Sequence, residues 1–83
     1  MAQAPASSIR RAILLLVEGN WKAAHEIVQK DEESELSCWA HGIVHVMEGD
    51  LPNARYWYRQ AKRAFPDPYS IPDEIAALKA ASD

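Results

Sequence analysis

The chain has 83 residues, with nine Lys or Arg against twelve Asp or Glu, and a formal net charge of −3 with neutral histidines. A chain of this length forms one domain that buries roughly 60 to 65% of its unfolded surface. Its acidic balance provides no overall basic field to attract nucleic acid or anionic lipid, so neither is an expected partner.

The single Cys38 cannot form an internal disulfide, which favours a reducing compartment. Near the N-terminus, the stretch "IRRAILLLVEGN" has a basic pair followed by an apolar run that Glu18 interrupts after six residues. That run is too short for a secretion signal or a membrane span. We therefore expect a cytoplasmic protein without a membrane partner.

The first half of the chain predicts two helices. Residues 1–6, "MAQAPA", show no periodicity and predict a disordered tail. Ser7 or Ser8 is expected to cap a helix that runs to about Glu18. Gly19-Asn20 then ends that helix and caps the next one, "WKAAHEIVQK". This gives a first hairpin over residues 7–30.

A glycine followed by a helix-capping residue occurs again in the second half of the chain. Ser34 or Asp31 is expected to cap a third helix from Glu35 to about Glu48, and Gly49-Asp50 forms the next corner. Pro52 suits the first turn of a fourth helix, in a hairpin over residues 34–66. The fourth helix has an inward stripe made of Ala54, Tyr58, Ala61 and Phe65, and Pro66 and Pro68 end it.

A fifth short helix completes the predicted elements. It is expected from Pro72 to about Ala81, within a capping segment over residues 72–82. It presents Ile75 and Leu78, with Ile71 just before it. No stretch of the chain alternates polar and apolar residues as a strand does, so the predicted class is all-α.

Gly19 and Gly49 are thirty residues apart, a spacing typical of internal repeats. The second hairpin resembles a tetratricopeptide repeat at Gly42, Gly49-Asp50, Ala54, Tyr58, Ala61 and Pro66. The first hairpin resembles it more loosely, at Ala12, Gly19-Asn20 and Ala24. The resemblance implies two stacked antiparallel helix-turn-helix hairpins, and a C-terminal helix that packs Ile71, Ile75 and Leu78 onto the second one.

The chain departs from the repeat template at several places. Cys38 takes the place of the template tryptophan, and Trp39 follows it. His41 and His45 stand where Leu and Tyr are usual, and Asp31 replaces the later alanine of the first hairpin. The strings "AAHEIVQ" and "EGDLPNARYWYRQA" are also similar to those of a group of small bacterial proteins, a likeness that implies no particular activity.

The leading functional hypothesis is a non-enzymatic adaptor or scaffold module without a cofactor. In the resembled family, the inner groove is lined by positions that correspond here to Ile9, Ile13, Leu16, Trp39, Ile43, Val46 and Met47. An exposed apolar stripe of this kind is typical of a surface that binds a partner helix or peptide, with Trp39 as its anchor. The alternative occupants are the fifth helix, a second copy of the chain as a homodimer, and a small ligand.

The second hypothesis is a ligand or metal site. His41 and His45 lie four residues apart on one helical face, and His25 of the second helix is expected to point toward that face. Histidines at this spacing can share a metal ion, with Cys38 or Glu48 as further ligands. The competing interpretation is that all three histidines are packing residues, because a bare H-x3-H pattern is a weak signal.

Other chemistry has less support in the sequence. Cys38 and His41 would both lie within a helix, where a buried thiol is inert, so no catalytic residue is expected. The sequence has no glycine-rich phosphate loop and no nucleophile elbow. A helically spaced basic set is interpreted as a solvated outer face, and it consists of Arg55, Arg59, Lys62 and Arg63.

Overall fold

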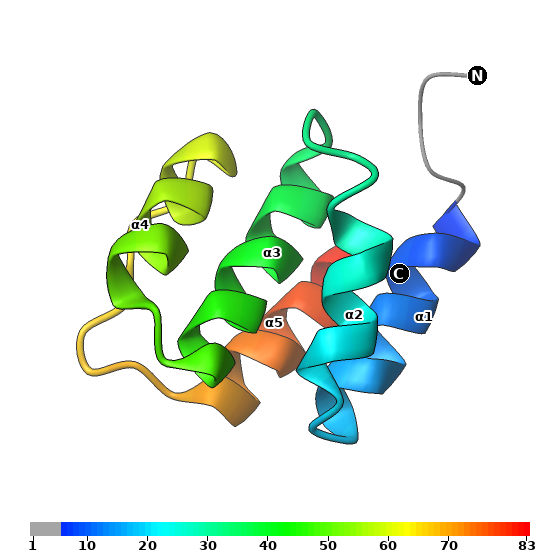
Figure 1. Ribbon diagram of the computed structural model, residues 1–83, viewed down its shortest axis with the longest axis horizontal. Helices are drawn as coiled ribbons and strands as arrows, with labels where there is room; N and C mark the ends of the chain where they lie inside the picture. Colours follow the sequence, from blue (N-terminus) through cyan, green and yellow to red (C-terminus); the bar gives the residue numbers. More distant parts are fainter. Residues whose placement is uncertain (1–5) are drawn as a thin grey trace.

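The structure is a computed structural model that describes residues 6–83. Within that range the chain forms helices and loops, without a strand, which confirms the all-α class (Figure 1). The helices are α1 (Ala6–Val17), α2 (Trp21–Val28), α3 (Glu35–Glu48), α4 (Leu51–Gln60) and α5 (Ile71–Ser82). None of these helices is both long and apolar enough to cross a bilayer. The predicted tail lies outside the described residues, except for Ala6, which is already helical.

The predicted helix corners are confirmed. Gly19 and Gly49 have φ values of 80° and 95°, in the left-handed region that glycine adopts without a steric cost. The side chains of Asn20 and Asp50 each accept a hydrogen bond at 3.3 Å from the backbone N–H three residues later. Each corner therefore ends one helix and caps the next.

The structure also tests the predicted N-terminal caps of α3 and α1. Ser34 caps α3 by accepting from the Ser37 N–H at 3.3 Å, whereas Asp31 accepts from the N–H groups of residues 33 and 34 in the turn before it. The proposed cap at Ser7 or Ser8 is wrong, because α1 begins at Ala6 and both serines lie inside its first turn.

Helix α4 ends five residues earlier than its apolar stripe predicts. Lys62 adopts a positive φ of 61°, and the Arg63 N–H donates to the Tyr58 carbonyl at 3.0 Å, which closes the helix with a left-handed turn. Phe65 therefore lies in the loop after α4, where its ring packs edge-on against Tyr58 with centroids 5.1 Å apart. Phe65 packs against the core, as its place in the predicted stripe suggests, but it does so from the loop.

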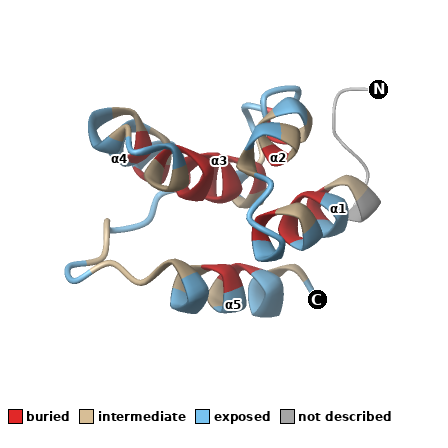
Figure 2. Cartoon of the chain, turned by 60° about the horizontal axis from the view of Figure 1, so that its bottom comes forward, coloured by how far each residue is buried: buried red, intermediate tan, exposed pale blue. Residues whose placement is uncertain are grey.

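Helix α3 is the centre of the molecule. Every residue from 37 to 45 is buried, and α1, α2, α4 and α5 all pack against this helix (Figure 2). The approach of α4 is especially close at Gly42. A Cβ atom at Gly42 would lie only 2.5 Å from Cδ1 of Tyr58, so only glycine fits beneath that ring.

Helix α5 packs against both α1 and α3. The contact with α3 was expected, and the contact with α1 adds a helix of the first predicted hairpin. Glu74 Oε1 accepts hydrogen bonds from Trp39 Nε1 at 3.1 Å and from the Tyr58 hydroxyl at 2.6 Å. A single carboxylate oxygen of α5 therefore binds donors on both α3 and α4.

The tyrosine hydroxyls extend this network. Tyr58 and Tyr69 share a hydrogen bond of 2.6 Å, and since Tyr58 donates its proton to Glu74, Tyr69 must donate to Tyr58. Burial, together with the hydrogen bond to Glu74, raises the pKa of Tyr58 far above its ordinary value. Burial also raises the pKa of Tyr69 to about 12. Both hydroxyls therefore stay protonated at neutral pH and remain donors.

We expect Gly42→Ala to lower the free energy of unfolding by about 1 to 3 kcal/mol, because the added methyl group overlaps the Tyr58 ring. Helix propensity alone predicts the opposite sign, since alanine is favoured over glycine inside a helix. Urea denaturation measures the difference. In a Tyr58→Leu background the same substitution should cost much less, and an equal cost in both backgrounds would contradict the close-contact explanation.

Candidate metal centre

The predicted partner groove is filled by the protein's own C-terminal helix. Helices α1 and α3 contribute the predicted residues, and α5 lies against both helices. Trp39, the predicted anchor, is only 2% exposed and donates a hydrogen bond to Glu74 of α5. The other lining residues are buried or half-buried, and they are Ile9, Ile13, Leu16, Ile43, Val46 and Met47. Apart from Val46, the predicted groove residues belong to the hydrophobic core or pack against it.

The three histidines lie together on the side of α3 that packs against α2. His41 and His45 are buried on α3, and His25 is half-buried on α2. These are the only histidines in the sequence, and each has a nitrogen atom within 4.8 Å of nitrogen atoms of the other two. The structure therefore brings together all three residues of the predicted ligand cluster.

The distances between the rings suit a shared ion. The ring centroids are 4.9 Å apart for His25 and His41, 5.3 Å for His25 and His45, and 5.0 Å for His41 and His45. Three imidazoles bound tetrahedrally to one zinc ion at about 2.0–2.1 Å have centroids roughly 5 Å apart. Their bound nitrogen atoms are then roughly 3.3 Å apart. In the structure, the three candidate nitrogen atoms lie within 4.8 Å of one another.

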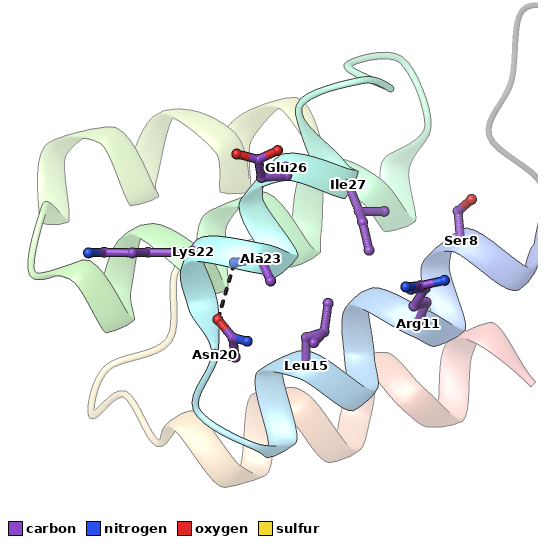
Figure 3. Close-up of a pocket in the computed structure, with 8 residues that line it drawn as sticks. All are labelled: Ser8, Arg11, Leu15, Asn20, Lys22, Ala23, Glu26 and Ile27. Atoms are coloured by element: carbon purple, nitrogen blue, oxygen red, sulfur yellow. Dashed lines mark hydrogen bonds between the residues drawn. The ribbon is translucent and has the colours of Figure 1, made fainter.

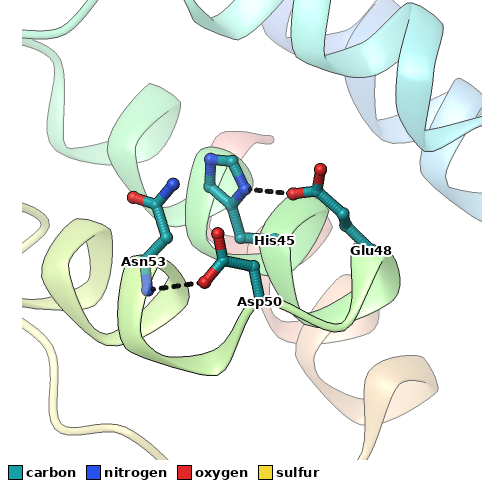
Figure 4. Close-up of polar contacts among 4 residues, drawn as sticks. All are labelled: His45, Glu48, Asp50 and Asn53. Atoms are coloured by element: carbon teal, nitrogen blue, oxygen red, sulfur yellow. Dashed lines mark hydrogen bonds and ion pairs between the residues drawn. The ribbon is translucent and has the colours of Figure 1, made fainter.

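Glu48 orients the ring of His45. Nδ1 of His45 lies 2.7 Å from Oε1 of Glu48, one helical turn later on α3 (Figure 4). When the neutral ring donates from Nδ1 to this carboxylate, Nε2 carries the free lone pair that binds a metal. A carboxylate behind a histidine ligand is the usual way in which proteins orient such a ligand and raise its basicity.

The ring of His41 stacks on Trp57 of α4. The two rings are stacked, with centroids 3.9 Å apart and planes 8° from parallel. Nδ1 of His41 is buried and has no hydrogen-bond partner. Burial, reinforced by the neighbouring His45 and His25, lowers the pKa of His41 to about 3. Its imidazole is therefore neutral at physiological pH, the form that binds metals.

Two other predicted ligands are placed differently. The Cys38 thiol donates to the Glu32 carbonyl at 3.4 Å, and burial raises its pKa, with the Asp31 charge adding to the effect. It belongs to none of the candidate ligand groups found among residues 6–83. Glu48 does form such a group with His45 and Asp50, at the edge of the histidine cluster. Glu48 therefore contributes from outside the three rings.

An open hollow lies elsewhere, between α1 and α2 (Figure 3). Its volume is about 680 Å³, and Arg11, Leu15 and Glu26 are among the residues that line it. No histidine lines it, and none of its lining residues belongs to a candidate metal-ligand group found in the described part of the chain. The histidine cluster therefore lies outside this hollow.

Trp57 is part of the site, although the sequence analysis did not predict it. It follows directly on α4 from Tyr56 and precedes Tyr58, whose ring faces Gly42. Successive helical residues point about 100° apart, so Tyr58 facing Gly42 directs Trp57 to an adjacent part of α3. The sequence signal for Trp57 was the run Tyr56-Trp57-Tyr58. A single inward-facing stripe of a helix does not need three consecutive aromatic residues.

No protein family, curated protein or solved structure matches the chain.

The lowered pKa of His41 predicts an acid-dependent loss of stability in the metal-free protein. Below pH 6.5 the unfolded chain protonates this histidine and the folded chain does not, so stability present above pH 6.5 is lost as the pH falls toward 3. At pH 4.5 this loss amounts to about 2 to 3 kcal/mol. In His41→Phe, which keeps a ring against Trp57, the difference in unfolding free energy between pH 7.5 and 4.5 should shrink by that amount. An unchanged difference would show that His41 titrates normally.

Proposed function

We propose that the protein binds a divalent late first-row transition-metal ion, such as zinc, through His25, His41 and His45. The observation that carries this proposal is the convergence of every histidine in the chain on one point, from two different helices. Imidazole is a preferred ligand of zinc, copper and nickel, whereas calcium and magnesium prefer oxygen.

The chemistry of the cluster favours ligation over simple packing. His41 replaces an apolar residue of the repeat template and carries a buried nitrogen atom without a partner, which costs about 1 to 3 kcal/mol. His45 has a carboxylate behind it that directs a free lone pair away from Glu48. Packing alone requires neither feature.

Each residue then has a distinct role. His41 and His45 provide two nitrogen ligands from one face of α3, and His25 provides the third from α2. Glu48 positions His45, and Trp57 fixes the plane of the His41 ring. Three protein ligands leave one tetrahedral position for water or another small donor, as in open zinc sites.

The scaffold of this site is proposed to be of tetratricopeptide-repeat type. The glycine corners, the small residue Gly42 beneath Tyr58, and the placement of α5 against α1 and α3 support that arrangement. The metal would then link α2 of the first hairpin to α3 of the second. A partner helix in the inner groove has less support, because it would have to displace α5 and break the hydrogen bonds of Glu74.

Titration of the chain, without a histidine tag, with ZnCl₂ tests the proposal. We expect one ion per chain by calorimetry and a rise in the free energy of unfolding of about 2.7 kcal/mol when free zinc is 100-fold above Kd. His25→Gln and His45→Gln should each abolish stoichiometric binding. Glu48→Gln should retain it with roughly 10- to 100-fold lower affinity.

Glu35→Gln is the matched control, because Glu35 also lies on α3 but pairs with Lys62, away from the histidines. This variant should bind zinc as the wild type does. Nickel and cobalt titrations, followed by tryptophan fluorescence quenching in the wild type and in Trp57→Phe, report whether the ion binds beside the His41 ring. Zinc binding that survives His25→Gln, or no binding by the wild type, would overturn the proposal.

A further inference from the structure

We propose that the protein forms a symmetric dimer in which α1 packs antiparallel against α1 of a second copy, with Leu14 at the twofold axis. The fold leaves this face of α1 exposed. It is independent of the metal site.

The first observation is an exposed apolar face. Leu14 and Val17 are 62% and 64% exposed, the highest values among the large hydrophobic residues exposed in the described structure. They lie three residues apart on α1 and therefore share one side of the helix. Large apolar side chains that are exposed together are typical of protein interfaces.

The second observation is the shape of the surface beside these residues. Leu14 and Val17 border a hollow of about 320 Å³ whose other lining residues include Ile13 and Lys79. Val17 and Lys79 also border a second, mostly apolar hollow of about 510 Å³ between α1 and α5. A side chain from a neighbouring helix can enter these hollows without displacing α5, so this face accepts a packed helix.

The third observation is the charge pattern, which selects a second copy as the occupant. Arg10, Leu14 and Glu18 follow one another at four-residue spacing, and the Glu18 N–H still donates to the Leu14 carbonyl at 3.1 Å. With a twofold axis at Leu14, Arg10 of one copy faces Glu18 of the other. Both residues are then about 6 Å along the helix from the axis. The match occurs twice, as an isologous interface requires.

Neither charge is already satisfied within the described residues. The ion pairs found there join His45 to Glu48 and Lys62 to Glu35, and neither Arg10 nor Glu18 takes part. Both side chains are exposed. The face therefore has an apolar centre and two free, opposite charges at its ends, which complement the same face of another copy.

Sedimentation equilibrium of the full chain, from low micromolar to near-millimolar concentration, tests the dimer. The wild type should approach twice the chain mass of 9.3 kDa. Leu14→Glu should remain monomeric, whereas Leu51→Glu, at an exposed apolar residue on α4, should dimerise as the wild type does. A wild type that stays monomeric throughout overturns the proposal, as does dimerisation by Leu14→Glu.

Charge exchange tests the antiparallel register directly. Arg10→Glu and Glu18→Arg each place like charges opposite one another twice, and each should weaken self-association about tenfold. An equimolar mixture of these two variants restores both opposite-charge pairs and should form a heterodimer of wild-type affinity. If mixing gives no recovery, or if either variant alone dimerises normally, the register is wrong. Circular dichroism confirms that each variant is folded, and none of these substitutions touches the histidines.

Discussion

The close contact between Tyr58 and Gly42 is the constraint on which the rest of the structure depends. Because no side chain separates them, α4 lies deep against α3, and the Tyr58 hydroxyl reaches Glu74 of α5. The same approach places Trp57 in stacking contact with the ring of His41. Gly42 in the central helix α3 thus determines two contacts. It lets Tyr58 bind Glu74 of α5, and it lets Trp57 pack against the histidine cluster.

The sequence predicted the elements that depend on local interactions. Asn20, Asp50 and Ser34 cap helices with their own side chains, and Gly19 and Gly49 need only a left-handed backbone, so neighbouring residues were sufficient evidence. The end of α4 could not be predicted in this way. Lys62 has no intrinsic preference for a positive φ, and it adopts one where Phe65 and Tyr69 fold back around Tyr58.

The sites depended on tertiary contacts. Helical spacing placed His41 and His45 on one face, but the approach of His25 depends on how α2 packs against α3. The apolar stripe around Trp39 was first interpreted as a partner groove, because periodicity cannot tell whether a helix of the same chain covers such a stripe. Glu74 determines that α5 covers the stripe, because its half-buried carboxylate accepts hydrogen bonds from donors on α3 and α4. The sequence alone does not show that these donors lie beside it.

Polar groups are buried on two faces of α3. They have hydrogen-bond partners on the face toward α5, but not all of them do on the face toward α2. Toward α5, Trp39 Nε1 and the Tyr58 hydroxyl are satisfied by Glu74, so that interface is complete within one chain. Toward α2, histidines occupy positions where an apolar residue would give more burial, and Nδ1 of His41 is left without a partner. A small domain has little stability to spare for such a substitution. An ion shared by the three rings would turn this weakness into a link between α2 and α3, because ligands that bind only the folded state stabilise it.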